Sequence, residues 1–384
     1  MSGPETPKMD HLDRKLKEPV LPTLDTLLHA PFSWRSLALN VFQPIAAILL
    51  GVALSLIAVK LLGDSPVLVL KTLVKSAVGT REDLGMTLFY ATPLIFTGLS
   101  VAIAFQAGLF NIGAEGQLMC GAMAAAVVGI LGKHVSVGLA PVLASAAAFV
   151  AGGVWGFIPG WLRARRGSHE VINTIMLNFV AIGITSYLTL YLFKNPDNQI
   201  PETAMIAPQY AFEKWTWFGD TPLNVSFVIA LVTAILVWMF LWRTTLGYEI
   251  RAVGDNEEAA HTVGIDSARI RMIAMSLAGA VAGMVGINEV LGASGKFKMG
   301  FSPEYGFMGI AVALLGRNRP LGVVCSALLF GALHKGAGAL DMETEKVTRD
   351  FSEILQALII LTVSATGFWE FVTKRMRRKG MPKS

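Results

Sequence analysis

Long apolar runs separated by short polar segments occupy the chain from residue 38 to residue 373. A helix needs about 20 apolar residues to cross the roughly 30 Å core of a bilayer, and most of these runs have that length. We therefore predict an all-α fold, a polytopic transmembrane helical bundle of about ten spans. The predicted spans are 38–62, 87–105, 114–132, 137–162, 171–193, 223–242, 270–292, 304–316, 320–340 and 352–373.

The eighth predicted span, 304–316, is too short to cross a bilayer as a single helix. A helix of that length rises only about 20 Å. The helix must therefore begin earlier, near Phe297, or form only half of a crossing.

The composition supports a membrane protein. Hydrophobic residues make up 53% of the chain and the mean hydropathy is +0.56. Charged residues make up 15%, against roughly 25% in soluble domains. The net charge of +5 could suggest a nucleic-acid partner. The charges lie between apolar runs and form no single basic stripe, so no nucleic-acid partner is expected.

The positions of Lys and Arg predict which ends of the spans face the cytoplasm. With ten spans and a cytoplasmic N-terminus, the cytoplasmic segments hold 20 of the 32 Lys and Arg residues. This excess follows the positive-inside rule and places both termini in the cytoplasm. The cytoplasmic segments are then 1–37, 163–170, 243–271, 317–319 and 374–384.

Three regions follow from this topology. Residues 1–37 form a polar, proline-rich cytoplasmic tail, with either an interfacial helix near Trp34 or a flexible segment. Residues 38–373 form the transmembrane domain, which contains the long cytoplasmic loop 243–271. Residues 374–384 form a basic cytoplasmic tail.

The ten spans divide into two groups that suggest an internal repeat. An offset of five spans reverses topology, which is how an inverted five-helix pseudo-repeat arises. Each half has a glycine-interrupted stretch after its first helix, at 106–116 and at 292–306. The prediction rests on topology, because no sequence identity between the halves is visible.

The segment 106–117 places polar side chains and glycines between two apolar runs. Its polar residues are Gln106, Asn111, Glu115 and Gln117. Irregular backbone at membrane depth is tolerated only against protein or a water-filled cavity, and a buried carboxylate needs a partner or hydration. The segment is either a lining of a translocation pathway that contacts a solute, or a tight corner between helices in which the amides cap helix ends.

The loop 243–271 contains a short predicted helix. Asp255 can cap its start, with Glu258 completing a capping-box-like pair, and Gly264 can end it. About two turns of helix cannot persist alone in water. The helix therefore docks either on a cytoplasmic partner or on the inner face of its own protein.

Other polar and reactive residues carry weaker signals. Asn173, Asn178 and Asn288 lie inside spans, where asparagine usually links helices by hydrogen bonds. Glu289 lies near the end of its helix and can reach the outer interface. The two cysteines and six histidines have no metal-ligand spacing, so neither a metal nor a cofactor is expected.

The sequence contains no Gly-x-x-x-x-Gly-Lys-Ser/Thr motif and no soluble region large enough for a nucleotide-binding domain. Any ATP used by this protein must therefore be hydrolysed by another polypeptide. The chain itself is not expected to be an enzyme.

The two motifs together resemble the permease subunits of bacterial ABC importers of the branched-chain amino acid, simple sugar and nucleoside group, over about residues 40–375. The stretch 107–117, Ala-Gly-Leu-Phe-Asn-Ile-Gly-Ala-Glu-Gly-Gln, is similar to the nucleoside (guanosine-type) branch. Sugar permeases usually carry an Asp-Leu-Ser-type sequence there. The stretch 247–264 looks like the segment that couples the family's permeases to their ATPase. His261-Thr262-Val263 departs from the more usual Arg- or Lys-containing spacing.

The resemblance implies a function and a set of partners. It implies a permease in the bacterial inner (plasma) membrane that imports a small polar solute, with a nucleoside as the first choice and a simple sugar or a branched-chain amino acid as the alternative. It also implies two permeases in a heterodimer, ATPase subunits and an extracytoplasmic substrate-binding protein. The implied coupling residues are Gly254, Asn256, Glu257, Glu258, Ala259, Ala260 and Gly264.

An ion-coupled secondary transporter is a rival interpretation of the same helices. Such a transporter would more often bury coupling carboxylates in mid-span, and it has no use for a capped cytoplasmic helix. Glu115 is the one strong candidate for a coupling carboxylate in this sequence.

Overall fold

A computed structural model describes residues 34–196, 199–344, 346–348 and 350–365. The chain separates into two compact units, residues 1–46 and 47–384. Within the smaller unit, the described residues are the helical residues 34–46. The helical bundle belongs to the larger unit. Most of the predicted N-terminal tail and the whole basic tail 374–384 lie outside the described residues.

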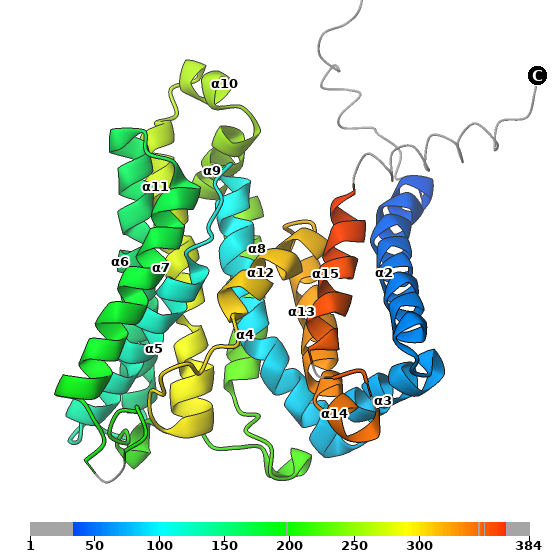
Figure 1. The fold of residues 1–384 in the computed structure, drawn as a ribbon. Helices are drawn as coiled ribbons and strands as arrows, with labels where there is room; N and C mark the ends of the chain where they lie inside the picture. The colour runs from blue at the N-terminus through cyan, green and yellow to red at the C-terminus, as the bar shows by residue number, and fades with distance from the viewer. Residues whose placement is uncertain (1–33, 197–198, 345, 349, 366–384) are drawn as a thin grey trace, which may run out of the picture. The chain divides into compact units, whose positions relative to one another are not determined.

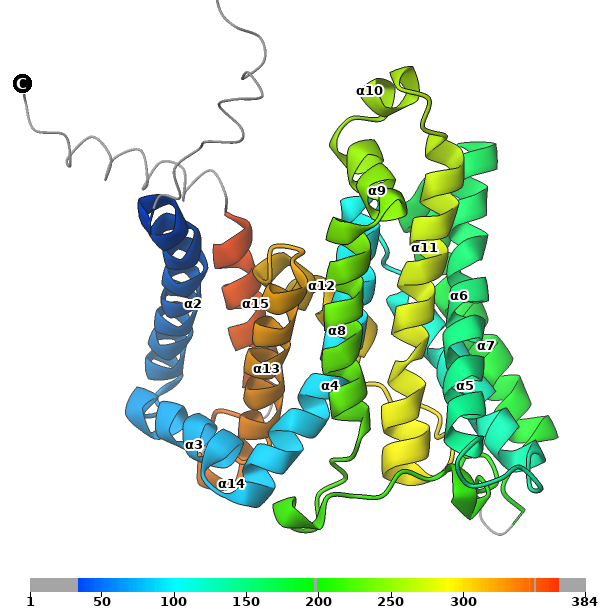
Figure 2. The same cartoon turned by 180° about the vertical axis from the view of Figure 1, so that it is seen from behind.

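The described residues are almost entirely helical (Figures 1 and 2). Within them, β-structure is limited to isolated bridges in the connecting segments. The α-helices are α2 (Trp34–Leu62), α3 (Pro66–Val78), α4 (Arg81–Gln106), α5 (Ala114–Leu131), α6 (Ala140–Arg166), α7 (Glu170–Tyr187), α8 (Ser226–Arg243), α9 (Thr245–Asp255), α10 (Glu257–Thr262), α11 (Ser267–Gly283), α12 (Tyr305–Leu315), α13 (Pro320–Ala337), α14 (Leu340–Glu343) and α15 (Phe351–Ser364). Two π-helical segments, η1 (Leu188–Leu192) and η4 (Ile287–Ser294), extend α7 and α11. Two short 3-10 turns, η2 (Pro208–Tyr210) and η3 (Thr216–Phe218), lie in the connection before α8.

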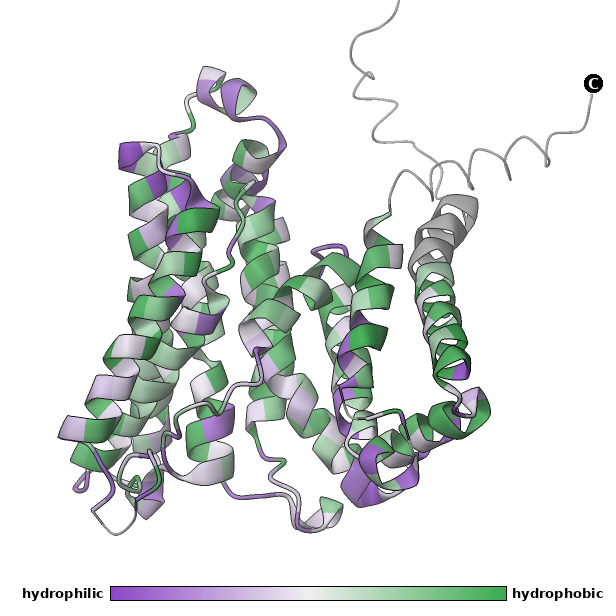
Figure 3. Cartoon of the chain, in the orientation of Figure 1, coloured by the Kyte–Doolittle hydropathy of each residue, from purple (hydrophilic) through white to green (hydrophobic). Residues whose placement is uncertain are grey.

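The predicted all-α membrane fold is confirmed. Among the described residues, eight helices are long and apolar enough to cross a bilayer, and two shorter apolar helices, α12 and α15, match the other two predicted spans. Figure 3 shows hydrophobic residues along the helices and hydrophilic residues at α10 and at other helix ends. The count of ten spans and the inverted repeat remain predictions.

The eighth predicted span is a half-helix, α12, preceded by irregular chain. The segment 295–304 is not helical, so α12 does not begin near Phe297. It packs on α4, where Gly309 lies against Thr97, and Gly98 lies against Val312. Figure 1 shows α12 partway along the bundle.

Two helices of more than ten residues, and the four-residue α14, were absent from the sequence prediction. Helix α3 follows α2 after a short turn, with Ser65 capping its first turn. Helix α9 occupies residues that we expected to form a loop, and its start is capped by Thr244, which accepts from the Gly247 N–H at 3.0 Å. Gly254, one of the implied coupling residues, lies inside α9 and not in a loop.

Helices α6 and α11 lie side by side and touch through glycines. A Cβ at Gly152 or Gly279 would overlap the carbonyl oxygen of the other residue, and a Cβ at Gly156 would lie 2.9 Å from the Gly279 Cα. Gly283 continues this contact against Gly152. Both helices thus carry a Gly-x-x-x-Gly pair, which lets their backbones approach closely. Close packing matters in a bilayer, because the hydrophobic effect does not drive helices together there.

Candidate translocation and coupling sites

Residues 107–113 form a tight corner between α4 and α5. The Asn111 and Gln117 side-chain amides pair reciprocally, with nitrogen–oxygen distances of 2.8 and 3.0 Å. Asn111 also donates to the Ser100 hydroxyl on α4 and accepts from the Gly113 N–H, at 3.1 Å each. Both amides are buried. In this conformation the two side chains bond within the protein and present no free face to a solute.

Asn178, on α7, forms hydrogen bonds to the backbone of the same corner and of α5. Its side-chain oxygen accepts from the Gly116 N–H at 2.8 Å, and its nitrogen donates to the Ile112 carbonyl at 2.9 Å. The close packing at Gly116, where a Cβ would lie 2.9 Å from that oxygen, fixes the distance between the helices. Interhelical linkage, the role predicted for this asparagine, is confirmed.

Glu115 joins the two irregular segments that interrupt the helices. One carboxylate oxygen accepts from the Gly306 N–H at 2.8 Å, and the Ser302 side chain also bonds the carboxylate. The buried carboxyl group therefore caps the start of α12, where a helix presents free N–H groups and a partial positive charge. The stretches 106–116 and 292–306, far apart in sequence, meet at this residue.

Gln106 is the last residue of α4. It contacts two segments, 243–271 and 317–319, that the charge pattern predicts to be cytoplasmic. Its amide donates to the Asn318 carbonyl at 3.2 Å, which ties α4 to the turn after α12. Its own carbonyl lies so close to Gly254 that a Cβ there would overlap it. Gly108, with a left-handed φ of 69°, also faces Gly254. The candidate pathway segment and the candidate coupling loop are thus in direct backbone contact.

Helix α10 begins one residue later than predicted. The cap is Asn256, whose side-chain oxygen accepts from the Ala259 N–H at 3.0 Å. The predicted pair of Asp255 and Glu258 was wrong, because Asp255 is still the last residue of α9. Asn and Asp are about equally good caps, so the local sequence alone did not decide between the two positions.

The predicted end of α10 at Gly264 is confirmed. Gly264 has a φ of 87°, and its N–H donates to the His261 carbonyl at 3.0 Å. The next N–H, of Ile265, donates to the Ala260 carbonyl at 3.0 Å. This pair of bonds is a Schellman motif, which requires a residue that tolerates a left-handed backbone.

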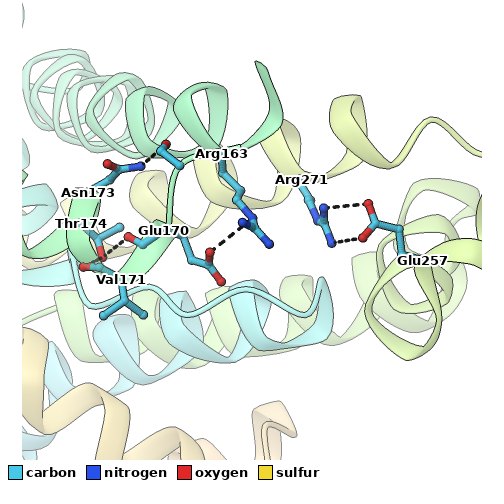
Figure 4. Close-up of polar contacts among 8 residues, drawn as sticks. Arg163, Glu170, Val171, Asn173, Thr174, Glu257 and Arg271 are labelled. Carbon is cyan, nitrogen blue, oxygen red and sulfur yellow. Dashed lines mark hydrogen bonds and ion pairs between the residues drawn. The ribbon is translucent and has the colours of Figure 1, made fainter. Parts of the chain in front are cut away.

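An ion pair holds α10 to α11. Arg271 donates to both carboxylate oxygens of Glu257, at 2.8 and 2.7 Å (Figure 4). A second ion pair, Arg163 to Glu170 at 3.3 Å, joins the ends of α6 and α7. A bidentate arginine–carboxylate pair fixes geometry as well as charge, so α10 is presented in a defined orientation.

The implied coupling residues of α10 lie on different faces of the helix. Ala260 is buried within the chain, while Ala259 and Glu258 are exposed. Val263 is 73% exposed, although it is apolar and follows a rigid helix. A change at Ala260 would therefore disturb the protein's own packing, and Val263 is the better probe of a partner surface.

The other polar residues predicted in spans have partners within the protein. Asn288 accepts from the Ser226 hydroxyl at 2.7 Å and donates to Glu289 at 3.3 Å. Asn173 donates to Ser168 at 2.6 Å, within its own helix start (Figure 4). The sequence prediction missed the glycine pairs of α6 and α11, although their four-residue spacing inside apolar runs is a readable signal.

Comparisons with known proteins agree with this arrangement. Residues 84–364 match the family model described as "Branched-chain amino acid transport system / permease component". The chain is 37% identical to the guanosine ABC transporter permease protein NupP of Bacillus subtilis, over 89% of this chain and 98% of that protein. It is 32% identical to the glucose ABC transporter permease protein TsgB13 of Haloferax volcanii (85% and 88% covered). It is also 28% identical to a second Bacillus subtilis protein, the guanosine ABC transporter permease protein NupQ (64% and 78% covered).

Proposed function

The chain belongs to the permease components of the branched-chain amino acid transport family, and on this premise we propose that it imports a nucleoside with energy from a separate ATPase. The observation that carries the proposal is the direct contact between the coupling loop, at Gly254, and the corner at Gln106 and Gly108. Through this contact, a movement of α9, which joins α10 at Asn256, would be passed directly to the corner.

The nucleoside assignment rests on two supports. The corner sequence 107–117 is of the guanosine type, and a guanosine permease is similar to this chain over nearly its whole length. A simple sugar is the second candidate, because the glucose permease of Haloferax volcanii is similar at 32% identity. These relatives are transport subunits, which agrees with the absence of a nucleotide-binding motif in this sequence.

The proposed complex contains two different permeases, two ATPase domains and an extracytoplasmic binding protein. Two distinct guanosine permeases of one organism, NupP and NupQ, are both similar to this chain, which supports a heterodimer. The rigid, partly apolar surface of α10 at Ala259 and Val263 supports docking of the ATPase on this side.

Contacts between connecting segments support the proposed topology. Three contacts join segments that the ten-span arrangement places outside: Val347 N–H to the Asp64 carboxylate, the Gln209 amide to the Lys133 carbonyl, and Thr203 N–H to the Phe297 carbonyl. At the other end, Gln106 contacts Asn318 and Gly254, which the same arrangement places inside. Every one of these contacts joins segments that the ten-span arrangement places on the same side of the membrane.

Cysteine labelling tests the orientation. In a background without Cys120 and Cys325, Arg165→Cys should be protected from a membrane-impermeant maleimide in intact spheroplasts, whereas Glu213→Cys should react. Both positions are exposed, so accessibility to the reagent depends only on the side of the membrane. Equal reaction of both cysteines, or the reverse pattern, would contradict the topology.

The corner residues take a positioning role in this proposal. Asn111, Glu115 and Gln117 bond within the protein, so they hold the breaks of α4 and α12 against the coupling loop. Translocation would move this corner as a unit, and a solute would meet these side chains only after the corner had opened.

Reconstituted transport tests the function. The permease, its partner permease, the ATPase and the binding protein in proteoliposomes should accumulate guanosine when ATP is present on the α10 side. A protonophore should have no effect, because the energy comes from ATP. Uptake that requires a proton gradient but no ATP would favour the secondary-transporter alternative and would overturn the proposal.

A further inference from the structure

A cavity of about 430 Å³ lies between α12, α13 and α15. Its inner wall is apolar, with Phe330 and Ala311 buried, and Phe307 at its edge is 41% exposed. This volume falls in the range of about 300–1,000 Å³ that is usual for small-molecule sites. Neither the corner segment 106–117 nor the coupling loop 243–271 contributes a residue to it.

One buried polar side chain in the cavity wall lacks a hydrogen-bond partner. Gln356 lines the cavity and is only 5% exposed, and its amide nitrogen has no hydrogen-bond partner among the described residues. An unsatisfied buried polar group is costly, and a native protein rarely keeps one without a reason. The nitrogen is also closed to water in this conformation, so the Gln356 side chain must turn before an acceptor oxygen or nitrogen of a solute can satisfy it.

Three carboxylates surround the opening. Glu304, Asp350 and Glu353 line the cavity and are exposed, and the described part of the chain offers none of them an ion pair. Glu304 also has a left-handed φ of 62°, which a residue other than glycine seldom adopts. Strained residues of this kind cluster at ligand sites, where the surrounding structure holds them.

We propose that this cavity binds the transported nucleoside, with Gln356 donating to the base, Phe307 stacking on it and the carboxylates accepting from ribose hydroxyls. The inference rests on the proposed function, and it identifies the site that acts on the solute. Guanine offers two acceptors, N7 and O6, on one edge. Carboxylates hydrogen-bond ribose hydroxyls in nucleotide sites, and aromatic side chains stack on any base.

The position of the cavity suits an importer. In the proposed topology, Asp350 and Glu353 lie at the outer end of α15, and Glu304 precedes the start of α12. The cavity therefore extends from the outer face to the half-helix whose start Glu115 caps. A solute bound there would contact α12 directly. Only α12 would then separate the solute from the corner at residues 107–113, which the coupling loop contacts.

Uptake of radiolabelled guanosine by the complete reconstituted complex tests the site. Gln356→Met keeps the side-chain length but removes the donor, and it should lower the maximal uptake rate about 3- to 10-fold, the effect of one hydrogen bond. Glu353→Gln should also lower the maximal uptake rate. Gln209→Met and Glu213→Gln, the same changes outside the cavity, should leave it at the wild-type value. Co-purification of the ATPase and basal ATP hydrolysis should be unchanged in all four variants.

A labelling experiment covers the case in which a cavity variant fails to fold. In a complex without Cys120 and Cys325, Phe307→Cys should react with a maleimide, and free guanosine should slow that reaction whereas glucose should not. Unchanged uptake in the cavity variants, unslowed labelling, or equal protection by glucose would each overturn the assignment of a nucleoside to this cavity.

The same data separate this inference from the proposed function. A wild-type complex that imports guanosine while the cavity variants behave as wild type keeps the function and overturns the site. A complex that imports no nucleoside overturns the function, and guanosine protection at position 307 then still decides whether the cavity binds it.

Discussion

Replacing Gly279 with leucine should prevent α6 and α11 from packing and should sharply lower the yield of folded protein. The new side chain would overlap the Gly152 carbonyl oxygen, and its Cβ would lie 2.8 Å from the Gly156 Cα. Overpacking typically costs about 1–3 kcal/mol. We expect a loss at the upper end of that range or beyond, because backbone atoms cannot move aside as a side chain can.

The matched control is Gly183→Leu. Gly183 lies in α7, also a predicted membrane helix, and a Cβ there would meet no atom within 4 Å. Both variants gain the same side chain and the same helix propensity. Size-exclusion profiles and melting temperatures of the purified proteins should therefore separate them clearly. If the two variants melted at the same temperature, the glycine contact would not stabilise the bundle.

Replacing Val263 with aspartate should uncouple the permease from its ATPase. Val263 is 73% exposed at the end of a helix that is capped at both ends and held by the Glu257–Arg271 ion pair. If a partner covers this residue, the new carboxylate would be buried without a partner. The loss should reach that of an interface hot spot, about 2 kcal/mol or a roughly 30-fold weaker association.

Val137→Asp is the control for this prediction, because Val137 is also 73% exposed and lies in a connection that the topology places on the opposite side. Co-purification of the ATPase and solute-stimulated ATP hydrolysis should fall in the Val263 variant and remain at wild-type values in the Val137 variant. Normal association of the Val263 variant would show that α10 is not the docking surface.

Features that depend on short-range interactions were predictable from the sequence, and those that depend on packing were not. Gly264 was found because a left-handed C-terminal cap is a local requirement that glycine meets best. The cap at Asn256 was misplaced by one residue, because Asp255 satisfies the same local rule and only the packing of α9 against the end of α4 extends that helix to Asp255. The buried pairing of Asn111 with Gln117 lies within one short segment, yet its geometry depends on α4 and α7.

The sequence by itself determined the class of this protein and its long apolar helices, because the bilayer, and not the packing of the fold, sets the lengths of the apolar runs. It also identified both candidate motifs, whose polar residues stand out against an apolar background. Only the tertiary structure decided that Glu115 caps α12, that Gly254 touches Gln106, and that Gln356 lines a cavity without a partner. These contacts join residues up to 191 positions apart, as for Glu115 and Gly306, and they depend on how helices pack, which local hydropathy does not encode.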